Sequence, residues 1–194
     1  MVFGSNTVAV IAPDAVTSGV KQPLWLRFPE RLRETRERSD LNQIEISDLA
    51  SLARPATSRF EGGLHRPSVE VVERYACALG VSPTWLAFGF DGFEAWRERV
   101  PRKGEPERAD PTPQPAQRDC PEASRGIPER LRHAREQSGL SMRAIARATE
   151  LSAQTIALIE AGRSVPLISN IEAIAKALTV SPGWLAFGEI DEGE

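Results

Sequence analysis

Few side chains in this sequence have the types and spacing that catalysis or metal binding requires. His65 and His133 have no partners at metal-ligand spacing, so no metal site is predicted. The sequence has no evident nucleophile–base pairing and no glycine-rich phosphate loop, which makes an enzyme the least favoured class, and no cofactor is predicted. The other polar side chains become informative only once the elements that carry them are known.

The composition is that of an ordinary globular protein. Of the 194 residues, 41% are apolar and 26% are charged, and the formal net charge is −3. No apolar run approaches the roughly 18 residues of a membrane span, and the N-terminus lacks the charged and apolar regions of a signal peptide. We therefore expect no membrane association and a cytoplasmic location.

A gap-free internal repeat organises the chain. Shifted by 99 residues, the sequence matches itself from 28–89 to 127–188, and 26 of the 62 aligned positions are identical. The segment "PERLR" occurs near the start of both ranges, and "VSPTWLAFG" at the end of the first returns as "VSPGWLAFG". We call residues 28–89 copy one and residues 127–188 copy two. Each is long enough to fold as a small domain, and copy two is the more electropositive, at +2 against −1.

Helical signals fill both copies. In copy two we expect helices over 128–137, from Ser141 to about Thr149, over 153–160, over 168–178 and from Ser181-Pro182 onward. Ser152 is a suitable N-cap for the third of these helices, and Gly139 is suited to ending the first. No segment of either copy alternates with period two, so no strand is expected there.

Two helices joined by a short turn, the second one short and amphipathic, form a helix-turn-helix unit. The stretches "GLSMRAIARATELSAQTIALIEAGRSVP" and "DLNQIEISDLASLARPATSRFEGGLHRPS" resemble the lambda-repressor-like family, also called Cro/CI or XRE. The resemblance implies an all-α fold: two tandem five-helix DNA-binding domains joined by a proline-rich linker. It also implies that helix three of each copy enters the major groove of double-stranded DNA while helix two crosses the backbone.

In copy two, the resemblance assigns the base contacts to helix three: Ala153, Gln154, Thr155, Ala157 and Leu158. Gln154 stands where the family usually reads a base, and a glutamine can pair bidentately with adenine. Phosphate contacts are expected from Ser152, Arg143, Arg147 and Arg163. The alternative for any one of these arginines is an ordinary solvated surface.

Copy one departs from this pattern. Its helix three is expected at 53–61, where Pro55 replaces Gln154 and cannot hydrogen-bond to a base edge. The candidate base contacts are Arg54, Thr57, Ser58 and Arg59, and the candidate phosphate contacts are Gln43 and Arg66. Glu45 and Asp48 on helix two would repel phosphates. Copy one is therefore the weaker candidate for reading DNA.

Some shared residues have structural interpretations. The resemblance implies an ion pair between helix one and the end of helix three, formed by Arg36 with Glu61 and by Arg135 with Glu160. The tryptophan shared by the two "WLAFG" segments is interpreted as core.

The remaining segments flank the two copies. Residues 1–27 are interpreted as a tail that is disordered or self-associating, 90–126 as a short helical extension and a flexible linker, and 189–194 as an acidic tail. A flexible linker of this length spans roughly 30–35 Å, close to the separation of about 34–36 Å between half-sites one helical turn apart.

The sequence thus favours a DNA-binding transcriptional regulator, most simply a nucleoid-associated repressor of a bacterium or phage, acting as one chain or as a homodimer. The alternative is an interaction module in which one or both copies bind a partner protein instead of DNA. Pro55, Glu45 and the acidic tail favour this alternative, above all for copy one.

Overall fold

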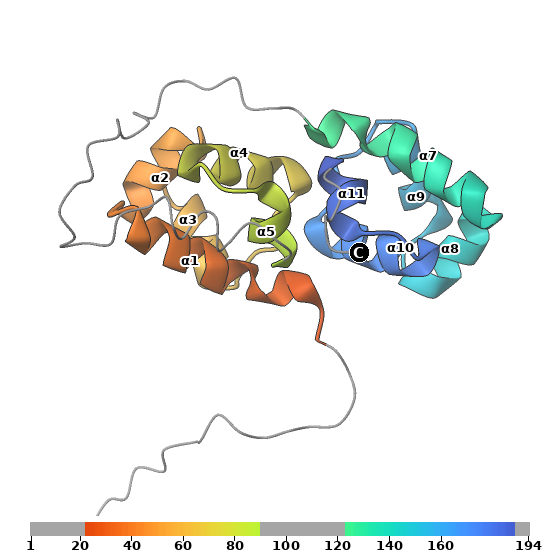
Figure 1. The fold of residues 1–194 in the computed structure, drawn as a ribbon, viewed down its shortest axis with the longest axis horizontal. Helices are drawn as coiled ribbons and strands as arrows, with labels where there is room; N and C mark the ends of the chain where they lie inside the picture. The colour runs from red at the N-terminus through yellow and green to blue at the C-terminus, as the bar shows by residue number, and fades with distance from the viewer. Residues whose placement is uncertain (1–21, 90–122, 189–194) are drawn as a thin grey trace, which may run out of the picture.

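The computed structural model describes residues 22–89 and 123–188, and it folds them into two helical bundles that lie side by side (Figure 1). The first consists of η1 (Leu24–Arg27), α1 (Phe28–Arg38), α2 (Gln43–Leu49), α3 (Ala56–Glu61), α4 (Val69–Leu79) and α5 (Pro83–Phe88). The second consists of η2 (Ala123–Gly126), α7 (Ile127–Ser138), α8 (Met142–Thr149), α9 (Ala153–Glu160), α10 (Ile168–Leu178) and α11 (Pro182–Phe187). Within these ranges there is no strand, and the predicted all-α class with two tandem helix-turn-helix bundles is confirmed. The interpretations of 1–21, 90–122 and 189–194 lie outside the described residues.

Three helices of copy two begin at predicted capping residues, and one ends at a predicted glycine. The side chains of Ser141, Ser152 and Ser181 each accept a hydrogen bond from a backbone N–H of the first helical turn. Each bond satisfies a donor that the helix itself leaves free. Gly139 ends α7 with a φ of 65°, a left-handed conformation that glycine adopts at low cost. These local choices set the limits of the helix-turn-helix pair α8–α9.

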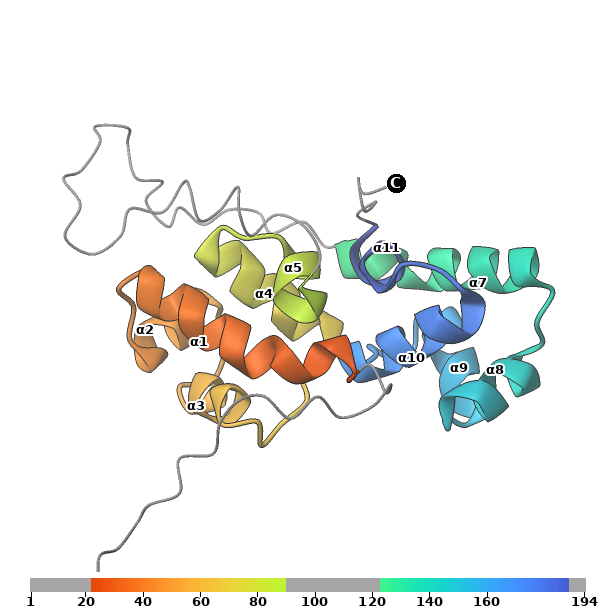
Figure 2. The same ribbon diagram turned by 60° about the horizontal axis from the view of Figure 1, so that its bottom comes forward.

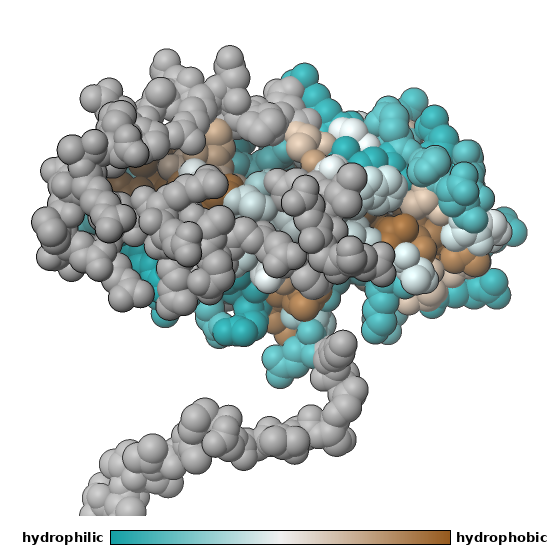
Figure 3. Space-filling model, viewed as in Figure 1, coloured by the Kyte–Doolittle hydropathy of each residue, from teal (hydrophilic) through white to brown (hydrophobic). Residues whose placement is uncertain are grey.

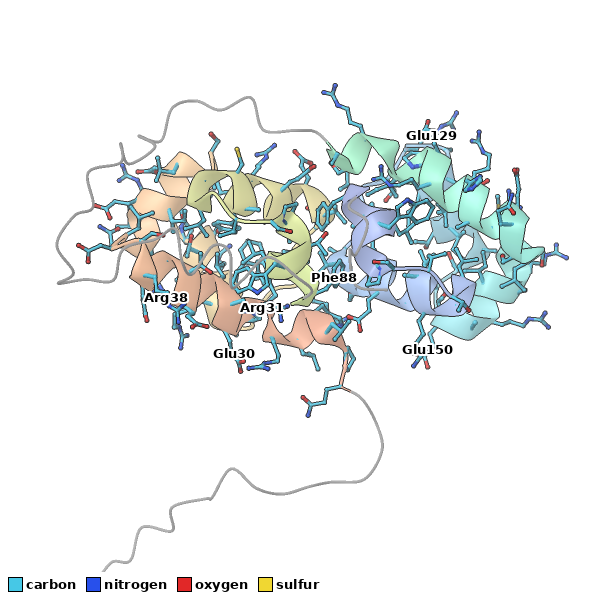
Figure 4. All side chains as sticks on the ribbon, viewed as in Figure 1. Glu30, Arg31, Arg38, Phe88, Glu129 and Glu150 are labelled. Carbon is cyan, nitrogen blue, oxygen red and sulfur yellow. The ribbon has the colours of Figure 1, made fainter. Side chains whose placement is uncertain are left out.

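Both copies begin one turn earlier than predicted. The segments Leu24–Arg27 and Ala123–Gly126, which were assigned to the tail and the linker, form the 3-10 helices η1 and η2. The cause is the first arginine of each "PERLR" segment. Arg31 donates to backbone oxygens of η1 and of the end of α5 (Figure 4), and Arg130 does the same with η2 and α11. Desolvation lowers the pKa of Arg31 to about 10, so this side chain is held by its carbonyl partners at some electrostatic cost.

The buried apolar residues of the two copies belong to one continuous core cluster. Equivalent residues of the first two helices are fully buried in both copies: Leu32, Ile46, Leu131 and Ile145. Trp85 is buried, and Trp184 is half-buried against the core, so the core interpretation of the shared tryptophan is confirmed. On the face drawn in Figure 3, hydrophilic residues form the outer rim of copy two and apolar residues show between its helices.

Two negative findings hold for the described ranges. No helix of 22–89 or 123–188 is long and apolar enough to cross a membrane. Nor do these residues gather three or more side chains of the kinds that bind metal ions.

Copy one contains a buried chain of hydroxyl groups that copy two lacks. The Thr57 hydroxyl lies 2.6 Å from that of Ser47 on α2 and 3.0 Å from that of Tyr75 on α4. All three side chains are fully buried, and the equivalent residues of copy two are apolar: Ala146, Ile156 and Ile174. These three hydroxyl groups therefore join α2, α3 and α4 by polar contacts, whereas the equivalent positions of copy two make apolar contacts.

Replacing Thr57 with valine should destabilise copy one by about 1–3 kcal/mol, because the buried hydroxyls of Ser47 and Tyr75 each lose one partner. Adding Tyr75→Phe removes one of these two hydroxyls, so the double variant should recover part of the loss. Hydrogen exchange of the full chain measures the effect, with the amides of copy two as an internal control. Equal protection of copy one in the wild type and in Thr57→Val would contradict this role.

The two copies pack against each other through equivalent elements. Helices α5 and α11 lie at the centre of the molecule in both ribbon views (Figures 1 and 2). Phe88, labelled at the boundary in Figure 4, packs against Phe187, the residue 99 positions later, with 6.5 Å between ring centroids. Ser68 and Leu167, another equivalent pair, form an isolated antiparallel bridge. The spacing of the copies is thus set by direct packing, which the flexible-linker interpretation did not anticipate.

Candidate nucleic-acid interface

The exposed N-terminal turn of α9 presents a glutamine among small or apolar neighbours. Gln154 is exposed, whereas Ile156 and Ile159 on the inner side of the helix are buried. The other predicted base contacts of α9 are half-buried or exposed: Ala153, Thr155, Ala157 and Leu158. An amide with small neighbours can approach a base edge closely, and its donor and acceptor match the major-groove edge of adenine.

Ser152 and Thr155 form the cap of α9. Ser152 Oγ accepts a hydrogen bond from the Thr155 backbone N–H at 2.9 Å and lies 2.8 Å from the Thr155 hydroxyl. One hydroxyl hydrogen suffices for the mutual contact. The other remains available for an outside acceptor such as a phosphate oxygen.

Three exposed arginines accompany α9. Arg143 and Arg147 lie four residues apart on α8 and so share one face of it, and Arg163 follows the end of α9. Within the described ranges, none of the three has a carboxylate partner within 4 Å. Positive charge that is not neutralised internally is what binding to DNA phosphates uses.

Helix α3 of copy one begins later than its predicted start at Ala53. Its first residue is Ala56, and Pro55 is its N-cap. Proline donates no backbone hydrogen bond and disfavours helical backbone at the preceding residue, so Arg54 and Pro55 precede the helix instead of forming its first turn. Arg54 lies 3.7 Å from Asp48 in an exposed ion pair. Ser58 and Arg59 are exposed on the helix and keep their place as candidate contacts.

The prediction that Thr57 contacts a base is wrong. Its side chain is fully buried, and its hydroxyl is used by Ser47 and Tyr75. The internal repeat carried the signal that would have prevented the error, since Thr57 aligns with Ile156 of the copy-two core.

The arginines beside α9 have no basic counterparts in copy one. At the positions equivalent to Arg143, Arg147 and Arg163, copy one has Ile44, Asp48 and Leu64. Ile44 is 51% exposed and Leu64 is 76% exposed, so both are apolar surface residues. Sequence reasoning noted Asp48 but missed these two, although the 99-residue shift identifies them. This arginine cluster is thus specific to copy two.

Gln43 and Arg66 already have partners inside copy one. Gln43 Nε2 donates to Glu61 Oε2 at 2.8 Å, and the Arg66 guanidinium lies 4.9 Å from the centre of the Trp25 ring. A phosphate contact by either side chain would have to compete with these interactions, and it stays a prediction.

A bidentate ion pair fixes the end of the third helix in each copy. Arg36 donates to the two carboxylate oxygens of Glu61 at 2.6 and 3.1 Å, and Arg135 donates to those of Glu160 at 2.8 and 3.0 Å. Both predicted ion pairs are present. A second arginine, which sequence reasoning missed, donates to the backbone oxygen of the same glutamate: Arg33 in copy one and Arg132 in copy two.

Acid should weaken copy two through Glu160. The hydrogen bond from Arg135 holds the pKa of Glu160 below its ordinary value. Burial opposes this shift, and the charge of Arg135 and the hydrogen bond and charge of Arg132 add to it. The folded chain therefore favours the deprotonated glutamate more than the unfolded chain does. The stabilisation is fully present above the unfolded pKa of about 4.3 and is lost as the pH falls through the lower folded pKa.

We expect the urea midpoint for the unfolding of copy two to fall as the pH is lowered below the unfolded glutamate pKa of about 4.3 and through the lower folded pKa. In Glu160→Gln it should be lower at neutral pH and depend less on pH, because the titrating group is gone. Glu150→Gln, which removes an exposed carboxylate at the end of α8, is the control. If Glu160→Gln kept the wild-type pH dependence, the ion pair would not be the source of the effect.

The fold and its exposed third helices define a helix-turn-helix protein. A family model described as a helix-turn-helix domain matches residues 27–87, and another described as helix-turn-helix matches residues 131–185. These two ranges together cover more than half of the chain. The chain belongs to the lambda-repressor-like (XRE) helix-turn-helix family, with two copies of the domain.

A curated relative agrees with this assignment. The "HTH-type transcriptional regulator DicA" of Escherichia coli (strain K12) is 35% identical over 66 residues, which are 34% of this chain and 49% of that protein. The chain thus spans about half the length of that regulator. No solved structure matches the chain significantly.

Proposed function

We propose that this chain binds specific sequences of double-stranded DNA and regulates transcription by occupying an operator, as a repressor. The observation that carries the proposal is the exposed Gln154 at the start of α9, accompanied by three arginines that have no carboxylate partner in the described ranges. The similarity to DicA, a transcriptional regulator by its name, supports the same class of function.

The proposed mechanism assigns separate tasks to neighbouring groups of copy two. Helix α9 enters the major groove, and Gln154 pairs with the edge of one base, adenine being the best match. Arg143, Arg147 and Arg163 bind the flanking phosphates and supply affinity that does not depend on sequence. The pair between Arg135 and Glu160 holds the far end of α9, so that little ordering is needed on binding.

Gln154→Ala should weaken binding to the preferred DNA site by about 1–3 kcal/mol and relax selectivity at one base pair. Binding to random DNA should change little, because the phosphate contacts are intact. Titrations of the full chain with the preferred duplex and with random duplex measure both effects. Gln137→Ala, which removes an equally exposed amide from α7, is the control. Unchanged affinity and selectivity in Gln154→Ala would remove copy two as the sequence reader.

A second candidate function applies to copy one, which on this view binds a partner protein through the surface around α3. The exposed apolar side chains of Ile44 and Leu64, at the positions of two copy-two arginines, favour it. A contiguous patch of exposed apolar residues is typical of a protein contact. Placing arginine at these two positions of copy one separates the two candidate functions.

Replacing Ile44 and Leu64 together with arginine should increase DNA affinity, if the α3 surface faces the DNA backbone as we expect. Two added phosphate contacts should steepen the dependence of log K on log[salt] by about 2. The double variant Ile44→Gln, Leu64→Gln has similar polarity without charge and should leave the slope unchanged. If the arginine variant also left affinity and slope unchanged, the α3 surface would not face DNA, and the protein-binding function would be favoured.

A further inference from the structure

The contacts between the two copies are reciprocal. The Val69 N–H donates to the Pro166 backbone oxygen at 3.0 Å, and the Ile168 N–H donates to the Pro67 backbone oxygen at 3.1 Å. The two bonds are equivalent, because Val69 corresponds to Ile168 and Pro67 to Pro166 in the 99-residue repeat. Interfaces in which each partner offers the same surface are the kind that twofold-symmetric dimers use. Here both surfaces belong to one chain.

Two carboxylates extend the same symmetry. Glu172 of α10 accepts hydrogen bonds from the backbone N–H groups of Leu24 and Trp25 in η1, at 2.8 and 3.0 Å. Its equivalent, Glu73 of α4, accepts one from the Ser124 N–H in η2 at 3.0 Å. Because Arg31 holds η1 to copy one and Arg130 holds η2 to copy two, each carboxylate links the two copies.

One pair of equivalent positions in the interface departs from this symmetry, with a larger residue in copy one and a smaller residue in copy two. Thr84 of α5 faces Gly183 of α11 across the interface. A Cβ atom added at Gly183 would lie 2.8 Å from Thr84 Oγ1 and 3.2 Å from Thr84 Cβ, and nearer still to Thr84 Cγ2. Threonine places its two γ atoms in two of three staggered positions. Every rotamer of Thr84 therefore keeps at least one γ atom close to a Cβ atom at Gly183. The buried Thr84 hydroxyl has no hydrogen-bond partner in the described ranges, so this side chain acts here through its shape.

This arrangement favours pairing of unlike copies. Two first copies joined in the same geometry would bring Thr84 against Thr84, which overpacks the interface. Two second copies would place Gly183 against Gly183 and leave a gap where packing is lost. Only the combination of copy one with copy two fills the space.

We infer that copy one and copy two pair with each other in preference to like copies, and that a single chain therefore occupies an asymmetric DNA site with two unlike half-sites. The DNA part of this inference rests on the proposed function. Helices α3 and α9 lie along the same lower edge of the molecule, one in each copy (Figure 2). Gln154 marks one of these surfaces, whereas Pro55 stands at the equivalent position of the other, so the two half-sites differ in sequence.

The pairing is tested without DNA by Gly183→Thr in the full chain. Threonine suits the helix itself, because Thr84 occupies the same position of α5. The variant should raise amide exchange at Val69 and Ile168 by roughly tenfold or more through overpacking, and the swapped variant Thr84→Gly, Gly183→Thr should restore protection. Wild-type protection in Gly183→Thr, or no recovery in the swapped variant, would overturn the pairing. In either variant, exchange at core amides such as Ile145 reports whether copy two still folds.

The asymmetric site is tested with duplexes selected from random DNA by the full chain. Sedimentation should give one chain of 21.3 kDa per selected duplex, and a duplex with the α9 half-site repeated in inverted orientation should bind no tighter. Tighter binding of two chains to the inverted repeat would overturn the inference while leaving DNA binding intact. If the amide results held and no duplex were bound at all, the proposed function would fail and the pairing would stand.

Discussion

An arginine–glutamate pair between the first helix and the end of the third, buried in copy one and partly buried in copy two, holds each helix-turn-helix unit in place. Burying two charges is costly unless the ions are well paired and hydrogen-bonded, and here a bidentate arginine donates to both carboxylate oxygens, aided in copy one by Gln43. Because this pair recurs in both copies, the last residue of the third helix is fixed to the first helix at equivalent positions in each copy. Everything that the exposed face of that helix does depends on this constraint.

The exposed surfaces around α3 and α9 differ, although the two copies share the same fold. Copy two has an amide and three arginines around α9, whereas copy one has a proline cap, an aspartate and two apolar side chains around α3. The 26 identical positions of 62 include the ion pair and the "WLAFG" segment, which both copies use in the fold, whereas the exposed residues around α3 and α9 differ. Direct packing of the copies then fixes these two unlike surfaces relative to each other.

Local signals predicted most of the fold. Serine caps, the glycine at the end of α7 and helical periodicity gave the helices of copy two, and the repeat carried them over to copy one. The start of α3 was missed because a proline at the helix boundary has two outcomes, inside the first turn or before it. Thr57 was misassigned because a threonine fits an exposed helix as well as a buried hydroxyl chain. Only the three-dimensional contact with Ser47 and Tyr75 decides between them.

The docking of the two copies was not predictable from local pattern. It uses backbone groups of Pro67 and Pro166 and a threonine opposite a glycine, none of which has a distinctive sequence signal. The linker estimate gave a compatible spacing but no orientation. Likewise, η1 and η2 depend on arginines of the first helix reaching back to backbone oxygens, an interaction that helical periodicity does not report.

Selection from random duplex DNA by the full chain tests the central claim most directly. The account predicts enrichment of one non-palindromic motif, with its strongest base preference at the position contacted by Gln154 and a weaker half-site at fixed separation. Loss of that strongest preference on replacing Gln154, with the weaker half-site retained, would link the motif to α9. Enrichment of a palindrome, or of no sequence at all at low salt, would contradict the account.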